Sequence, residues 1–98
     1  MPNFSKPKIY LSGSITNNPD YKVQFTRKFR ELESNYRVLT PLFINADLSW
    51  QEYMLIDLAM IDVCDCIYML KGWKNSKGAI EEYKYAKEKG LKIIEEEE

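Results

Sequence analysis

Seven residues, Ser76-Lys77-Gly78-Ala79-Ile80-Glu81-Glu82, offer the groups best suited to chemistry in this chain. They follow an apolar run and open a segment of helical composition that ends at Gly90. A small-residue turn at a helix start leaves backbone N–H groups free to face an anion such as phosphate. Glu82 falls one helical turn after Gly78 on the same side, so small neighbours leave room beside its carboxylate. The competing interpretation is an ordinary first-turn acid that complements the helix dipole.

A second carboxylate, Asp57, stands out because of the stripe on which it falls. Ser49 and Glu52 form a capping-box pattern, which predicts a helix that starts after Ser49. One side of this helix is apolar and is expected to consist of Trp50, Tyr53, Met54, Leu58 and Ile61. Asp57 lies on that same side, so its side chain should face the core or the rim of a cleft. Leaving it unpaired there would be costly.

The elements that must position these acids alternate between strand and helix. A short strand over residues 8–11 runs into a small and polar loop over residues 12–19. Asn18 then predicts an N-cap, with Pro19 as the first residue of an amphipathic helix that extends to about Ser34. Its apolar residues recur at helical spacing, at Tyr21, Phe25, Phe29 and Leu32.

The second half of the chain continues the alternation. A strand over residues 36–40 is stopped by Pro41 and followed by a loop over residues 42–48. The helix after Ser49 leads to an apolar run over residues 64–70, typical of a strand buried on both faces of a parallel sheet. A loop over residues 71–75, a helix over residues 77–89 and a strand over residues 91–94 complete the chain. Three strand-helix repeats predict an α/β fold with a parallel sheet.

In an open parallel sheet, ligands bind beyond the carboxyl ends of the strands. The loop after the first strand brings Gly13, Ser14, Ile15 and Thr16 to that edge. Ser76, Gly78, Glu82 and Asp57 are expected to converge on the same cleft. Two carboxylates beside small-residue loops are sufficient for a reaction through an oxocarbenium-like transition state. One acid attacks or stabilises the anomeric carbon, while the other assists the leaving group.

Length and composition restrict the class of protein further. We expect residues 1–98 to form one domain, with residues 95–98 as an acidic tail. The net charge is -1, and without its four terminal glutamates the body is only slightly basic, which argues against binding to duplex nucleic acid. The chain has no histidine, so catalysis by Ser-His-Asp or Cys-His groups is excluded. Cys64 and Cys66 are interpreted as core thiols of a cytoplasmic protein, without a metal site, a cofactor or a membrane segment.

Three separated motifs resemble the nucleoside 2-deoxyribosyltransferases and the related 2'-deoxynucleoside 5'-phosphate N-hydrolases. The first is the strand and loop Tyr10-Leu11-Ser12-Gly13-Ser14-Ile15. The second is Asp57-Leu58 followed by Asp65, and the third is Gly78, Glu82 and Ala86 at intervals of four. The chain also looks like a set of small phage and bacterial proteins of that superfamily, through its Trp50 to Leu58 and Gly72-Trp73 features.

The resemblance implies a three-layer flavodoxin-like (Rossmann-like) sandwich with a four- to five-stranded parallel sheet. It implies that Glu82 is the nucleophile and that Asp57 orients the sugar and helps the leaving base. Tyr10 would contribute to the active site, although a purely core role is the alternative. Ser76 would bind a 5'-phosphate, and the family's habit of completing its pocket from a neighbouring subunit implies a homodimer or higher homo-oligomer.

The predicted function is therefore cleavage of the N-glycosidic bond of a nucleoside or nucleotide, by hydrolysis or by base exchange. Ser14, Ser76 and the backbone N–H groups of Gly13 and Gly78 would hold the 5' end, while Ile15 completes the loop. Trp50 and Trp73 are candidates for stacking on the base, with packing as the alternative. A non-catalytic nucleotide-binding module in the same cleft and a purely structural interaction protein stay open as other classes.

Overall fold

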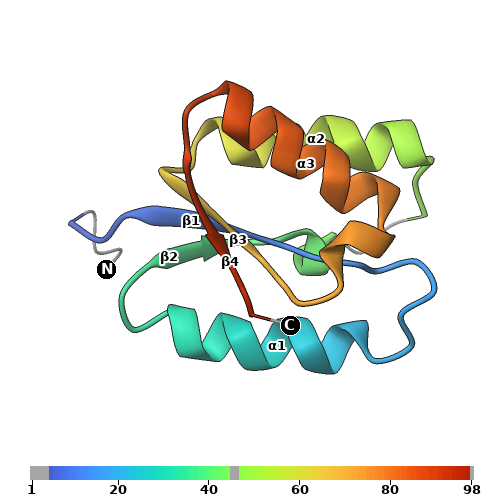
Figure 1. The fold of residues 1–98 in the computed structure, drawn as a ribbon, viewed down its shortest axis with the longest axis horizontal. Coiled ribbons are helices and arrows are strands. Elements are labelled where there is room, and N and C mark those ends of the chain that lie inside the picture. The colour runs from blue at the N-terminus through green and yellow to red at the C-terminus, as the bar shows by residue number, and fades with distance from the viewer. Residues whose placement is uncertain (1–4, 45–46, 98) are drawn as a thin grey trace.

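The computed structural model describes residues 5–44 and 47–97, which form four parallel strands and three α-helices (Figure 1). Two short 3₁₀ turns accompany them. In chain order the elements are β1 (Lys8–Ser12), α1 (Tyr21–Leu32), β2 (Arg37–Leu39), the turn Pro41–Phe43, α2 (Trp50–Asp62), β3 (Cys66–Met69), the turn Trp73–Asn75, α3 (Lys77–Glu88) and β4 (Lys92–Glu95).

The strand order is β2-β1-β3-β4, which is the order of a flavodoxin-like sheet over its first four strands. Helices α2 and α3 cover one face of this sheet and α1 covers the other (Figure 1). The predicted three-layer architecture is therefore confirmed, with four strands. In such a sheet the connections from β1 and from β3 lead to opposite edges of the sheet. Ligands bind at this switch point, between the carboxyl ends of β1 and β3.

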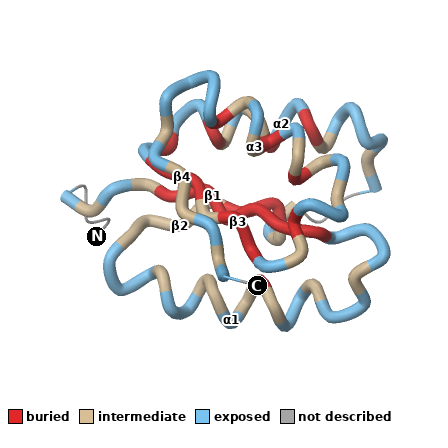
Figure 2. Tube along the Cα trace, in the orientation of Figure 1, coloured by how far each residue is buried: buried red, intermediate tan, exposed pale blue. Residues whose placement is uncertain are grey.

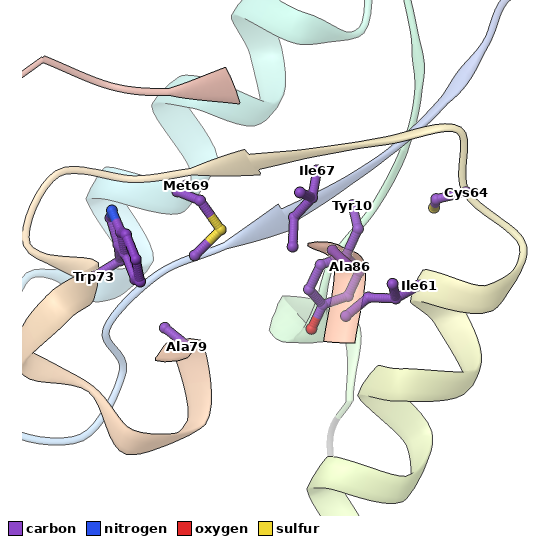
Figure 3. Close-up of a cluster of buried hydrophobic side chains, with 8 residues drawn as sticks. All are labelled: Tyr10, Ile61, Cys64, Ile67, Met69, Trp73, Ala79 and Ala86. Carbon is purple, nitrogen blue, oxygen red and sulfur yellow. The ribbon is translucent and has the colours of Figure 1, made fainter. Parts of the chain in front are cut away.

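Alternating side chains of β1 supply two separate hydrophobic cores. Tyr10 faces α2 and α3, where Figure 3 shows it among the buried side chains of one cluster. Leu11 faces the other side and packs with Phe25 of α1 and Leu70. Figure 2 shows the buried residues concentrated along the sheet and on the inner sides of α2 and α3. Because both faces of β1 are covered, it reads as a continuous apolar run in the sequence.

The local signals at two helix ends are confirmed. The Ser49 hydroxyl accepts a hydrogen bond from Glu52 N–H at 3.1 Å, and the Glu52 carboxylate accepts one from Ser49 N–H at 2.8 Å. Gly90 has φ +80 just after α3, so its backbone takes the left-handed conformation that ends a helix.

The predicted start of the first helix was wrong. Helix α1 begins at Tyr21, with Asp20 rather than Asn18 at the N-cap position. The Asn18 amide is occupied elsewhere, because Nδ2 donates to Ser14 O at 2.8 Å and to Gln24 Oε1 at 2.9 Å. Asn18 therefore ties the loop after β1 to α1 instead of capping the helix.

Two segments predicted as loops contain 3₁₀ turns, Pro41–Phe43 and Trp73–Asn75. Residues 45 and 46 of the predicted loop 42–48 lie outside the described residues. The acidic run also begins inside the fold, because Glu95 is the last residue of β4 and Glu96 N–H donates to Met69 O at 3.0 Å. Residue 98 of the predicted tail lies outside the described part.

Candidate active site

Strand β1 and helix α3 bring a carboxylate and two hydroxyl groups together beneath the sheet's switch point. Tyr10 Oη donates to Glu82 Oε2 at 3.0 Å, and Ser12 Oγ donates to Glu82 Oε1 at 2.6 Å. All three residues are buried, with Glu82 only 4% exposed. Tyr10 and Ser12 share one face of β1 because side chains two apart in a strand point the same way.

Asp57 and Glu82 occupy equivalent positions on neighbouring helices. On α3 the buried residues are Ala79, Glu82 and Ala86, and on α2 they are Met54, Asp57 and Ile61. In each helix the acid therefore lies three residues after one buried residue and four before the next. This spacing turns both carboxylates toward the same core.

Asp57 is 5% exposed, and its Oδ1 has no hydrogen-bond partner among the described residues. A buried polar atom without a partner costs about 1–3 kcal/mol. Such an atom is unusual in a folded protein and needs an explanation. The explanation here is the neighbouring Glu82, whose protonated carboxyl group can donate to Asp57.

The two carboxyl groups influence each other's protonation. Burial raises the pKa of Glu82 well above its usual value, and the nearby Asp57 raises this pKa further. The hydrogen bonds from Ser12 and Tyr10 oppose these two effects. Burial also raises the pKa of Asp57. Two adjacent buried carboxyl groups cannot both ionise cheaply, so the pair shares a proton and titrates as one unit.

Tyr10 is a hydrogen-bond donor in this arrangement. Burial raises the pKa of its phenol well above the usual value, and the negative charge of Glu82 raises it further. The phenol therefore keeps its proton at neutral pH and can donate to the Glu82 carboxylate. The Tyr10 ring belongs to the hydrophobic cluster in Figure 3, while its hydroxyl group donates to Glu82.

Gly78 lies one turn before Glu82, next to the first turn of α2. A Cβ atom at Gly78 would lie 3.6 Å from Met54 Sδ and 3.7 Å from Trp50 Nε1. Trp50 is 43% exposed although it was predicted on the buried stripe, and Lys77 Nζ lies 4.4 Å from the centroid of its ring system. Trp50 and Met54 therefore lie against the start of α3, one helical turn from Glu82.

The structure gives the predicted phosphate-binding residues other contacts. Ser76 Oγ accepts a hydrogen bond from Ala79 N–H at 3.1 Å and so caps α3. Gly13 is needed for packing, because a Cβ there would lie 2.9 Å from Leu70 Cβ and 3.2 Å from Phe25 Cζ. Ile15 is 36% exposed. None of these contacts joins these residues directly to the two carboxylates.

Ser14 faces a different part of the switch point. Its hydroxyl donates to Thr16 O at 3.3 Å. It lines a polar hollow of about 360 Å³, and neither carboxylate lines this hollow. The other residues that line it are Thr16, Asn17, Asn18, Gln24, Lys71, Gly72 and Asn75. Asp57 and Glu82 form a buried acid pair, whereas Ser14 lines a neighbouring hollow. Residues that were predicted to share one cleft therefore lie in two places.

Three further residues have structural roles. Trp73 is 6% exposed and stacks on Tyr83 with ring centroids 4.7 Å apart, which favours packing over contact with a base. Asp65 Oδ2 accepts a hydrogen bond from Lys8 N–H at 2.8 Å, so it fixes the start of β1. Cys64, like Cys66, is a free and buried thiol, as predicted, and burial raises the pKa of Cys64 to about 12.

Ser12 is the site residue that sequence reasoning missed. The strand was expected to end at Leu11, which left Ser12 in the loop, whereas β1 continues through Ser12. The available signal was its spacing of two from Tyr10, which places both on one face once the strand is extended.

No helix among the described residues is long and apolar enough to span a bilayer. Within residues 5–44 and 47–97, no group of three or more His, Cys, Asp or Glu side chains gathers closely enough to hold a metal ion.

The fold and the paired carboxylates define an α/β protein with an acid pair at the switch point of a parallel sheet. The chain belongs to the family described as a domain of unknown function (DUF4406), whose model matches residues 7–95. No curated protein matches the chain. Among solved structures, the chain is similar to the 2-desoxiribosyltransferase from Leishmania mexicana, with 23% identity and a TM-score of 0.70. The match covers 91% of this chain and 63% of that one, and it shows a shared fold.

Proposed function

We propose that this chain cleaves the N-glycosidic bond of a (deoxy)nucleoside or its 5'-monophosphate, with Glu82 as the nucleophile and Asp57 as the acid that assists the leaving base. The observation that carries the proposal is the Glu82 carboxylate held by Tyr10 and Ser12 and coupled to a second buried acid, Asp57. The fold shared with a 2-desoxiribosyltransferase supports the same class of reaction.

The shared proton supplies a division of labour. Burial and Asp57 favour the proton on Glu82 in the free protein, so in this scheme substrate binding moves the proton to Asp57 and leaves Glu82 ionised. A Glu82 oxygen forms a bond to C1' as the bond from C1' to the base nitrogen breaks, and Asp57 gives its proton to the departing base. Water then attacks C1', releasing Glu82 and returning a proton to Asp57. A second base in place of water gives base exchange.

Tyr10 and Ser12 orient the nucleophile in this scheme. Their hydrogen bonds favour the ionised form of Glu82 and hold both carboxylate oxygens in a fixed plane. A fixed carboxylate lowers the entropy cost of reaching C1'. We therefore assign Tyr10 and Ser12 to the positioning of Glu82.

Because Glu82 is buried, the substrate must displace the side chains that cover its carboxyl group before it can react. Trp50 and Met54 pack close to Gly78, one helical turn from Glu82, and are the side chains that we propose would move. Trp50 is half-exposed at the first position of α2, so its ring can move without disrupting the core. A base that stacked on Trp50 would replace the contact of this ring with Lys77. If the Trp50 ring then closed over the sugar, it would exclude water from the reacting atoms.

The test is release of free base from a panel of deoxynucleosides, ribonucleosides and their 5'-monophosphates, with and without an acceptor base. We expect release from at least one of them, and its loss in Glu82→Gln. Glu81→Gln is the matched control, since it makes the same change one residue away on the exposed side of α3. No release from any substrate would refute the function, and unchanged turnover in Glu82→Gln would refute the assignment of the nucleophile.

A nucleotide-binding module without catalysis is the second candidate. The observation that favours it is the polar hollow beside Ser14, which neither carboxylate lines. Isothermal titration calorimetry distinguishes the two candidates. Tight binding of a nucleotide with no released base would support the binding module over the enzyme.

A further inference from the structure

The backbone of Lys71 is held from both sides by side chains that are distant in sequence. Its carbonyl accepts a hydrogen bond from Gln24 Nε2 of α1 at 2.9 Å. Its N–H donates to Glu96 Oε1, just beyond β4, at 3.0 Å. Lys71 follows β3 closely, so both bonds act on the turn that leads from the sheet to α3.

These two bonds belong to a longer chain of contacts. Gln24 Oε1 accepts from Asn18 Nδ2 at 2.9 Å, and the same amide nitrogen donates to Ser14 O at 2.8 Å. At the other end, Glu96 Oε2 lies 3.3 Å from Lys28 Nζ of α1. The loop after β1, helix α1, the turn after β3 and the segment after β4 are therefore linked by side-chain hydrogen bonds.

The turn held at Lys71 determines where α3 begins. It passes through Gly72 at φ +88 and the 3₁₀ turn Trp73–Asn75 before Ser76 caps the helix. Gln24 and Lys71 line the polar hollow together with Ser14 of the loop after β1 and Asn75 of the turn before α3. The two hydrogen bonds at Lys71 therefore help to set the shape of this hollow.

We propose that Gln24 and Glu96 are positioning residues that clamp the Lys71 turn and so hold the start of α3 in place relative to the loop after β1. The consequence for substrate rests on the proposed function. Neither side chain has a hydrogen bond to Glu82 or Asp57, so the clamp acts on the shape of the polar hollow and not on the reacting atoms. Glu96, the first residue after β4, thus has a specific role within the acidic segment.

Amide hydrogen exchange of Lys71 tests the clamp without reference to any activity. Glu96→Ala removes the acceptor of this N–H, so we expect exchange at Lys71 about tenfold faster or more. Glu96→Gln keeps an acceptor oxygen and should restore most of the protection. Glu97→Ala is the matched control, because Glu97 is the exposed next residue and should leave the exchange unchanged. Unchanged exchange in Glu96→Ala, or an equal effect of Glu97→Ala, would overturn the inference.

Steady-state kinetics with a nucleoside that the wild-type chain cleaves test the functional consequence. A looser hollow weakens binding of the substrate's 5' end beside Ser14 without altering the reacting groups, so Gln24→Ala and Glu96→Ala should raise KM about three- to tenfold and leave kcat within about twofold. A three- to tenfold loss of kcat with an unchanged KM would contradict a positioning role. If no nucleoside is cleaved, the proposed function fails, while the exchange measurement still decides whether the clamp exists.

Discussion

Replacing Glu82 by glutamine should change how the stability of the protein depends on pH. The pKa of Glu82 is raised in the folded protein, chiefly by burial and then by Asp57. Between the ordinary carboxyl pKa and this raised value, the folded protein holds a proton that the unfolded chain has released. The free energy of unfolding contributed by Glu82 is therefore fully present below the unfolded pKa and is lost as the pH rises toward the folded pKa.

The size of the effect follows from the exchange of one proton. A single retained proton makes the free energy of unfolding fall by about 1.4 kcal/mol per pH unit within this window. Solvent does not screen the interactions of the Glu82 carboxyl group, because this residue is only 4% exposed. Glutamine cannot titrate. The free energy of unfolding of Glu82→Gln should therefore fall less steeply with pH than that of the wild type, by up to this amount per pH unit. The difference between the two proteins should start small near pH ~4 and widen toward neutrality.

Chemical denaturation followed by tryptophan fluorescence at several pH values measures this directly, since Trp73 is buried and stacked on Tyr83. The difference curve cancels groups that titrate in both proteins, among them Glu96, whose pKa is lowered mainly by the Lys71 N–H and Lys28 against an opposing burial effect. Glu81→Gln should run parallel to the wild type. If wild type and Glu82→Gln also run parallel, the carboxylate pair holds no extra proton, and the assignment of Asp57 as its carrier during catalysis is wrong.

Two further predictions follow from neighbouring contacts. Tyr10→Phe removes a bond that lowers the pKa of Glu82, so the acidic limb of the pH–rate profile should move to higher pH and kcat/KM should fall about tenfold or more; an unchanged profile would remove Tyr10 from the site. Gly13→Ala should lower the free energy of unfolding by about 1–3 kcal/mol because its Cβ would lie 2.9 Å from Leu70 Cβ. Gly78→Ala is its control, since the nearest atom there is 3.6 Å away, and equal denaturation midpoints for the two variants would refute the packing argument.

The fold could be predicted because its signals are local in sequence. Helical periodicity, the capping box at Ser49 and the stop at Gly90 each depend on residues within a few positions of one another. The start of α1 failed for the opposite reason. Asn18 has the composition of an N-cap, but its amide bonds Ser14 and Gln24, and a contact with a preceding loop has no signature in local composition.

The candidate site shows the same division. Asp57 and Glu82 could be singled out because an acid on a buried helical stripe breaks a local pattern. Ser12 was missed because strand ends are uncertain by a residue or more, and one residue decided its assignment. Glu96 was hidden inside a run of four glutamates, where composition indicates only a charged tail. Its bond to Lys71 becomes visible once β4 is in place.

The equivalent placement of Asp57 and Glu82 is itself an argument for function. Each acid interrupts the inner side of a helix that apolar residues would otherwise fill. Replacing buried charged groups by apolar ones of similar size is often neutral or stabilising, by about 1–4 kcal/mol. Two acids that face the same core therefore weaken this small fold. A ligand that hydrogen-bonds Asp57 and separates the two acids would relieve that cost, which is an energetic reason to propose that this site binds a ligand.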